Sequence, residues 1–331
     1  MARPGTLFGG ALIGTSFTTP AQVQELLDQL KLLGVDRIDT AARYSPTSPG
    51  ASERLLGQVE AAKQGFTIDT KLNTEGPSMS DGSGSLSSSA IVKSIHESYG
   101  RLGMDRVNTL YFHRPDPSTP VEEQAAEIHR QYLAGRFDKF GLSNFSPEQV
   151  AEFIAVCENK GYVKPSVYQG LYNLLDYTSH RTLFPLLREH GIAFNAYRFV
   201  FSRAIAVSYA DCIYSPLAGG FLTGRPTRGD VAGTRYAPDN KFSARMNAMY
   251  DKPEMHAAMT DLLDTIEPLQ ITGSEACLRW LYYHSILQEG DGVILGASKI
   301  SQITQNLGDI SKGPLPAEVV QKIEALRGQL G

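Results

Sequence analysis

Short β-rich runs alternate with helical patterns along almost the whole chain, and this alternation constrains the fold more than any other feature. Such alternation is typical of a parallel sheet covered by helices. The helix after the first run begins at Thr19-Pro20 and ends at Gly34, which gives it a capped start and a glycine stop. The runs that we predict to be strands are residues 7–14, 35–40, 66–71, 107–113, 137–143, 166–170, 192–197 and 293–296.

Eight such strands in a chain of 331 residues predict a single (β/α)8 TIM barrel that spans residues 1–331. The alternative is a doubly wound open sheet, which usually has a G-x-G-x-x-G motif after its first strand. Gly9-Gly10 and Gly14 do not fit that motif, so the barrel is favoured. Further helices are expected from Ser146-Pro147 onward, over 274–287 and over 316–326. A long loop is expected over 215–250, between the seventh and eighth strands.

The composition excludes several classes of protein. A formal net charge of -4 argues against a nucleic-acid partner and against binding to an anionic membrane. The three cysteines are far apart and lack C-x-x-C spacing, which argues against a disulfide framework and a zinc site. The first residues have no apolar signal segment, and no stretch is long and apolar enough to span a membrane. We therefore expect a cytoplasmic protein without a bound metal.

Four polar residues fall where a barrel of this kind places its active site, at the carboxyl ends of the strands. Asp39, Lys71 and His113 end the second, third and fourth predicted strands, and Tyr44 follows in the loop after the second. Singly, such an Asp is often a helix cap and such a Lys a surface charge. Together they suit carbonyl reduction. A lysine ammonium held by an aspartate makes the phenol a better acid, and a neutral histidine can orient the carbonyl oxygen.

These residues also resemble a known family. Asp39-Thr40-Ala41-Ala42-Arg43-Tyr44, Thr70-Lys71 and His113 are similar to the catalytic motifs of the aldo-keto reductases. His113-Arg114-Pro115-Asp116 and the residues 119–123 most resemble the branch of aflatoxin-aldehyde and succinic-semialdehyde reductases. The resemblance covers nearly the whole chain. It implies NADPH-dependent reduction of an aldehyde or ketone, with Tyr44 as the proton donor, and dimers are common in this branch.

The resemblance further implies a set of NADPH-binding residues. Ser143, Asn144 and Gln169 would hold the nicotinamide carboxamide. The segment 215–224 would wrap the pyrophosphate, because glycines and free backbone N–H groups suit an anion. Lys299 would meet a 2′-phosphate. The remaining residues of the expected site are Ser215, Pro216, Leu217, Gly219 and Gly224 in the phosphate segment, and Ser298, Gln302 and Asn306 at the adenosine end.

The sequence departs from the family pattern at residues 198–214, an atypical insert between Phe194-Asn195-Ala196-Tyr197 and the phosphate segment. The insert is open to three hypotheses: a translated intron, a surface loop, or a segment whose end, Cys212-Ile213-Tyr214, replaces Phe194-Asn195-Ala196-Tyr197 in the barrel. We favour the earlier segment as the strand. Two functional alternatives to the reductase stay open: a nucleotide-binding regulatory subunit, and a product whose catalysis the insert impairs.

Overall fold

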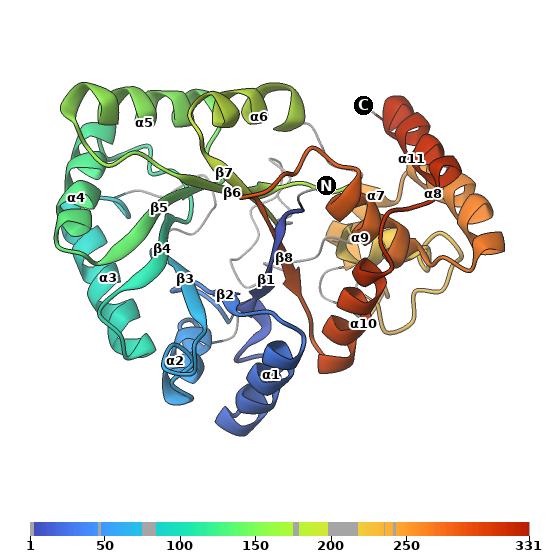
Figure 1. Ribbon diagram of the computed structural model, residues 1–331, viewed down its shortest axis with the longest axis horizontal. Coiled ribbons are helices and arrows are strands. Elements are labelled where there is room, and N and C mark those ends of the chain that lie inside the picture. The colour runs from blue at the N-terminus through green and yellow to red at the C-terminus, as the bar shows by residue number, and fades with distance from the viewer. Residues whose placement is uncertain are drawn as a thin grey trace.

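The computed structural model describes residues 3–45, 48–74, 84–174, 179–197, 218–234, 236–240 and 243–330. Its strands form a closed barrel in which every neighbouring pair is parallel and β8 pairs with β1 (Figure 1). This confirms the (β/α)8 barrel. The strands are β1 (Gly5–Gly9), β2 (Arg37–Asp39), β3 (Thr67–Lys71), β4 (Val107–Phe112), β5 (Phe137–Ser143), β6 (Val167–Leu171), β7 (Ala193–Tyr197) and β8 (Gly292–Gly296).

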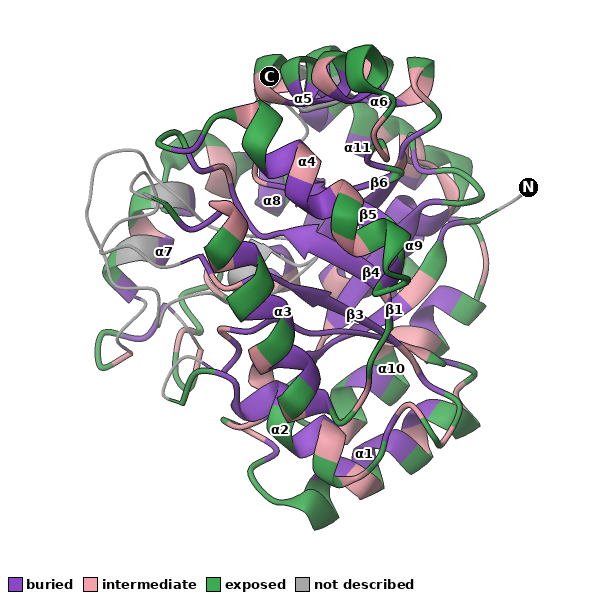
Figure 2. Cartoon of the chain, turned by 90° about the vertical axis from the view of Figure 1, so that its left-hand side faces the viewer, coloured by how far each residue is buried: buried purple, intermediate pink, exposed green. Residues whose placement is uncertain are grey.

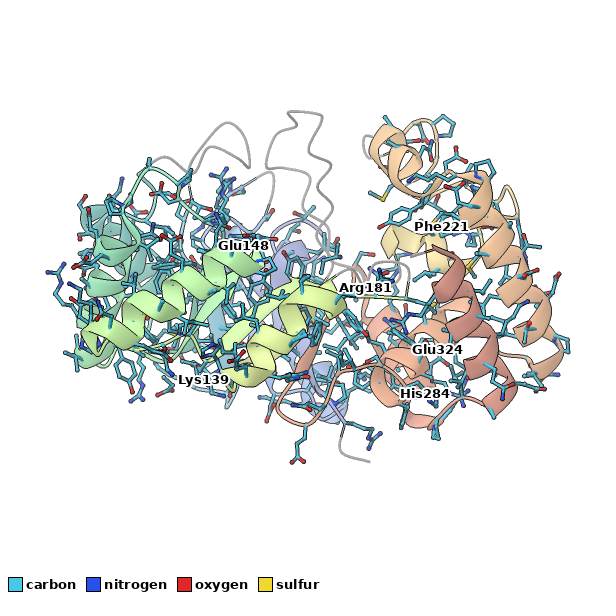
Figure 3. The ribbon with its side chains drawn as sticks, turned by 90° about the horizontal axis from the view of Figure 1, so that it is seen from above. Lys139, Glu148, Arg181, Phe221, His284 and Glu324 are labelled. Atoms are coloured by element: carbon cyan, nitrogen blue, oxygen red, sulfur yellow. The ribbon has the colours of Figure 1, made fainter. Side chains whose placement is uncertain are left out.

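Helices surround the barrel on its outer face. Seen from above, α5 and α6 lie side by side on one flank, where Glu148 and Arg181 are labelled, and η3 with Phe221 lies on the other (Figure 3). The helices are α1 (Pro20–Leu32), α2 (Ala51–Gln58), α3 (Ser88–Leu102), α4 (Val121–Leu133), α5 (Pro147–Lys160), α6 (Ser179–Glu189), α7 (Ser243–Tyr250), α8 (Pro253–Ile266), α9 (Gly273–Tyr283), α10 (Ile300–Ser311) and α11 (Ala317–Leu330), with 3-10 turns η1 (Gly10–Leu12), η3 (Ala218–Thr223) and η4 (Glu267–Leu269).

Two helices begin where their capping residues predict. The side chain of Thr19 accepts a hydrogen bond from the backbone N–H of Gln22, whose own side chain accepts from the backbone N–H of Thr19. Ser146 and Gln149 make the same reciprocal pair at the start of α5. Each pair satisfies two backbone donors that have no partner inside the helix. Gly34 follows α1 with a φ of +72°, a conformation that favours glycine, and so the predicted stop is confirmed.

The first strand was predicted to extend to residue 14, and this is wrong. β1 ends at Gly9, where its partners Asp39 of β2 and Gly296 of β8 also end, and Gly10–Leu12 turn into a 3-10 helix. The helix expected over 274–287 is also shorter, since α9 ends at Tyr283. The seventh strand is built from the earlier of its two candidate segments, as favoured. The described residues of the expected loop 215–250 include η3 and α7, whereas the insert 198–214 lies outside the described residues.

Most residues of the strands are buried, and the helices turn their exposed residues outward (Figure 2). Tyr111 of β4 is fully buried and packs over Gly141 of β5, where an added Cβ would overlap its ring. Gly141 thus makes room for an aromatic ring between two neighbouring strands. None of the helices in the described part of the chain has the length and apolar character needed to cross a membrane.

Candidate active site

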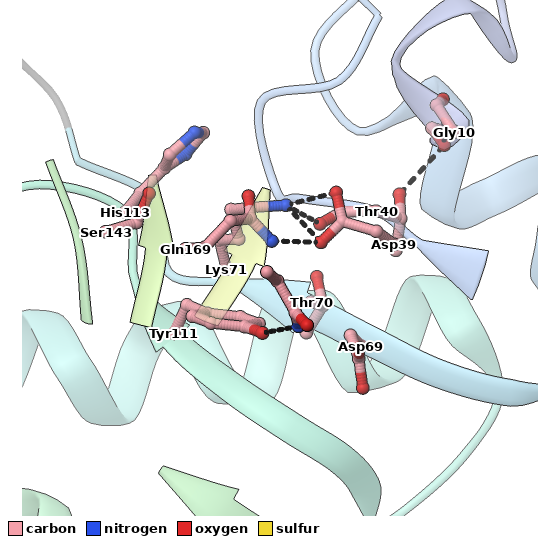
Figure 4. Close-up of polar contacts among 12 residues, drawn as sticks. Gly10, Asp39, Thr40, Asp69, Thr70, Lys71, Tyr111, His113, Ser143 and Gln169 are labelled. Atoms are coloured by element: carbon pink, nitrogen blue, oxygen red, sulfur yellow. Dashed lines mark hydrogen bonds and ion pairs between the residues drawn. The ribbon is translucent and has the colours of Figure 1, made fainter. Parts of the chain in front are cut away.

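A buried ion pair lies at the carboxyl ends of β2 and β3. The Lys71 ammonium donates to both carboxylate oxygens of Asp39, each at 2.7 Å, and to the backbone carbonyl of Thr40 at 2.9 Å (Figure 4). Both side chains are 0% exposed. Asp39 pairs in register with Asp69, so Lys71, two residues further along β3, is on the same face of that strand as Asp69. The alternation of side chains along neighbouring strands therefore brings the acid and the cation together.

Tyr44 and His113 lie beside this ion pair. The Lys71 ammonium is 4.7 Å from the centre of the Tyr44 ring, and the Tyr44 and His113 rings meet edge to face with centroids 5.9 Å apart. His113 follows directly after β4, and Tyr44 sits in the loop after β2. Both are buried. The structure thus brings the four predicted catalytic residues into one cluster at one rim of the barrel.

Burial disfavours every charge in this cluster. It raises the pKa of Asp39 and lowers that of Lys71, while their mutual attraction and hydrogen bonds act against both shifts. Burial also holds the pKa of His113 well below its usual value, and the cations Lys71, Arg114 and Arg43 act in the same direction. The His113 imidazole is therefore neutral around pH 7, which allows it to donate a hydrogen bond without carrying a charge.

Ser143, Asn144 and Gln169, the residues expected at the nicotinamide, lie together at the ends of β5 and β6. Ser143 pairs in register with Gln169. Gln169 donates its amide Nε2 to an Asp39 carboxylate oxygen at 2.7 Å. Its carbonyl oxygen is buried, with no hydrogen-bond partner among the described residues. Asn144 has a φ of +65° and donates to the backbone carbonyl of His113 at 2.9 Å.

The residues expected around the rest of the cofactor are described only in part. Ser215, Pro216 and Leu217 lie outside the described residues, Gly219 belongs to η3, and Gly224 has a φ of +79°. The remaining residues, Ser298, Lys299, Gln302 and Asn306, lie just before and within α10. There the Gln302 carbonyl accepts hydrogen bonds from the backbone and hydroxyl of Ser298 and from the backbone of Lys299. This capping interaction fixes the start of α10, and Lys299 is exposed next to it.

Three polar contacts near the site were not predicted from the sequence. The Tyr197 hydroxyl at the end of β7 donates to the side-chain carbonyl oxygen of Asn144. Asn195 donates to the Tyr111 hydroxyl at 2.8 Å. Arg37 forms an ion pair with Asp69 at 2.8 Å. The spacings Arg37-x-Asp39 and Asp69-x-Lys71 were a usable signal for the third contact, because alternate strand residues share a face. No group of three or more His, Cys, Asp or Glu side chains that could hold a metal ion occurs among the residues described.

A closed parallel barrel with a buried Asp–Lys pair, a tyrosine and a histidine gathered at one rim is an arrangement typical of a barrel enzyme and suited to carbonyl chemistry. The chain belongs to the Aldo/keto reductase family, whose model matches residues 7–209 and 212–327. An aldo-keto reductase of Pseudocercospora fijiensis is 34% identical to it, over 90% of this chain and 95% of the relative. The human aldo-keto reductase family 7 member A3 is 34% identical to it, over 96% of this chain and 92% of the relative. The mouse aflatoxin B1 aldehyde reductase member 2 is 32% identical to it, over 97% of this chain and 84% of the relative. The chain is thus an oxidoreductase of a family that reduces carbonyl compounds.

Proposed function

We propose that the protein reduces an aldehyde with NADPH and that Tyr44 donates the proton to the carbonyl oxygen. The observation on which this rests is the Lys71 ammonium, buried against Asp39 at 2.7 Å and 4.7 Å from the centre of the Tyr44 ring. A cation at that place favours the phenolate over the phenol, because the two charges attract each other where little water screens them. This attraction opposes the effect of burial, which by itself disfavours the phenolate, and so it helps Tyr44 to give up its proton.

His113 has a different part in the proposed reaction. Its pKa is held well below the usual value by burial, so the imidazole stays neutral at the pH where the enzyme works. A neutral imidazole can donate a hydrogen bond to the carbonyl oxygen, and it leaves the proton transfer to the phenol. Asp39 keeps Lys71 in place, since both of its carboxylate oxygens accept from the ammonium.

The residues at the end of β6 fit a nicotinamide group. The buried Gln169 carbonyl has no donor among the described residues, and the carboxamide of a nicotinamide has two N–H groups to offer. Ser143 lies on the neighbouring strand in register with Gln169. Bound there, NADPH would supply the hydride that reduces the carbonyl carbon. The exposed Lys299 before α10 is the residue we propose for the 2′-phosphate, and therefore for a preference for NADPH over NADH.

The aldehyde substrate class is proposed from the relatives. One of them carries the name aflatoxin B1 aldehyde reductase, and its match covers 97% of this chain. We extend only the aldehyde group to this protein. A suitable assay follows the loss of NADPH absorbance with 4-nitrobenzaldehyde or succinic semialdehyde.

The decisive test is Tyr44→Phe, which removes the hydroxyl and keeps the ring. We expect kcat to fall by about 10²–10⁴-fold, the usual contribution of a general acid. NADPH binding, measured by fluorescence quenching, should stay within about twofold, since the phenol oxygen is not among the proposed cofactor ligands. Tyr132→Phe is the matched control, because Tyr132 is 40% exposed on α4, and it should change neither value. Full kcat in Tyr44→Phe, or NADPH binding without turnover in the wild type, contradicts the proposal.

A further inference from the structure

Gln169 joins two parts of the site that are far apart in the sequence. Its side chain is 1% exposed at the end of β6, and its amide nitrogen faces the Asp39 carboxylate of β2, 130 residues away in the chain (Figure 4). Asp39 thus has two donors at one oxygen, the Lys71 ammonium and the Gln169 amide, each at 2.7 Å. Of these two donors the Gln169 amide is uncharged. It stabilises the Asp39 carboxylate by a hydrogen bond and does not exchange a proton with it.

The contact with Asp39 fixes the orientation of the Gln169 amide. A carboxylate accepts hydrogen bonds and does not donate them, so the amide nitrogen must face Asp39 and the carbonyl oxygen must face away. That oxygen is buried and has no partner among the described residues. Leaving a buried acceptor without a donor is unfavourable, and a bound group with an N–H would remove this cost.

We infer that Gln169 is a positioning residue that couples recognition of the nicotinamide carboxamide to the Asp39–Lys71 pair. This inference rests on the proposed function. When the Gln169 carbonyl accepts a hydrogen bond, the amide becomes more polarised and its N–H becomes a stronger donor to Asp39. The Asp39 carboxylate is then fixed more firmly in the position from which it contacts the Lys71 ammonium beside Tyr44. The carboxamide of the cofactor thereby contributes to the rate of reduction as well as to binding.

The test changes each side of the proposed contact between the Gln169 side chain and the nicotinamide carboxamide. Gln169→Met keeps the length of the side chain and removes both hydrogen bonds, and Gln169→Asn keeps an amide that is one methylene too short to span the same distance. On the cofactor side, the 3-acetylpyridine analogue of NADPH has a carbonyl but no N–H. Dissociation constants for the two oxidised dinucleotides and kcat with the two reduced ones are measured for each protein. Gln288→Met, at an exposed glutamine, is the matched control.

We expect Gln169→Met to lower kcat at saturating NADPH by about 10-fold, the scale of one hydrogen bond to a charged group. Two ratios between the natural dinucleotide and the analogue are compared: kcat for the reduced forms and the dissociation constant for the oxidised forms. Both ratios should shrink in Gln169→Met and Gln169→Asn and stay as in the wild type in Gln288→Met. Because the analogue differs in its own redox chemistry, only the change of each ratio between proteins is compared.

Two other outcomes overturn the inference. If the dissociation constant rises while kcat stays unchanged, Gln169 binds the cofactor and does not act through Asp39. If the wild type and both Gln169 variants show the same ratios, the carbonyl does not meet the carboxamide. A wild type that binds NADPH without turnover contradicts the proposed function itself. The assay of the wild type alone separates this outcome from a failure of the inference about Gln169.

Discussion

Removing Lys71 creates a buried charge with no cationic neighbour in direct contact. In Lys71→Met an unbranched apolar side chain remains, but Asp39 loses an ammonium that touches both of its oxygens at 2.7 Å. Among the described residues, the Gln169 amide is then the one side-chain donor left on Asp39. Both members of the pair are 0% exposed, so water cannot take the place of the ammonium. Breaking a buried pair from one side costs about 3–5 kcal/mol of stability. We expect Lys71→Met to lose that amount at neutral pH, and to lose most of its reductase activity as well.

The loss should depend on pH in a definite direction. Burial already raises the pKa of Asp39 in the folded protein, and the Lys71 ammonium acts against this shift. In Lys71→Met the folded pKa therefore rises further above the unfolded value of about 3.9. A carboxyl of this kind favours folding when it is protonated, so its contribution is fully present below about pH 4 and is lost as the pH rises through the folded pKa. Relative to the wild type, the variant should be less destabilised at pH 5 than at pH 8.

The single tryptophan gives the assay. Trp280 is fully buried, so its fluorescence reports urea unfolding at each pH. Lys63→Met is the matched control, because the pair of Lys63 with Glu60 is largely exposed, and its stability should change by less than about 0.5 kcal/mol. The double variant Lys71→Met/Asp39→Leu removes the unpaired charge and should regain much of the stability without activity. If Lys71→Met loses no more than the control, or loses equally at pH 5 and pH 8, the reasoning is refuted.

Two further predictions concern His113 and the cysteines. Since burial keeps the pKa of His113 well below its usual value, kcat should show no inflection near pH 6.5, and such an inflection that disappears in His113→Gln would contradict a neutral imidazole. Cys157 and Cys277 are buried, and burial raises the pKa of the Cys157 thiol to about 12 and that of Cys277 further still. In a Cys212→Ser background, a thiol reagent should therefore modify neither cysteine in the native protein and both after unfolding, and a rapid native reaction would count against this.

The fold was predictable because each strand and its helix leave local signals. The capping pair of Thr19 and Gln22 and the stop at Gly34 are visible in the sequence, and α1 follows them. The end of β1 was not predictable in this way. The residues after Gly9 stay apolar, but the strand stops because Asp39 and Gly296, its neighbours in register, stop there as well. A strand end depends on its partners, and the partners of β1 include a strand from the other end of the chain.

The same limit applies to the candidate site. Asp39, Lys71 and His113 could be found because each falls at a predicted strand end, and strand ends share a rim. The contacts of Gln169 with Asp39 and of Tyr197 with Asn144 could not be derived from spacing. They join residues that only the closure of the barrel brings together. Sequence patterns thus predicted the candidate reacting groups, and the three-dimensional structure was needed for the contacts that hold them in place.

The interior of the barrel explains why the Asp39–Lys71 ion pair is tolerated there. Barrel interiors are usually filled with branched apolar side chains, but here β2 and β3 each contribute two alternate charged residues. Arg37 pairs with Asp69 at 2.8 Å, and one layer nearer the rim Asp39 pairs with Lys71. Asp69 acts to raise the pKa of both Lys71 and Asp39, so it helps to keep the lysine charged but disfavours the aspartate anion. Arg37 balances Asp69, which leaves two cations and two anions in the stack. The lower pair therefore allows Asp69 to support the Lys71 ammonium without adding a net negative charge beneath Asp39.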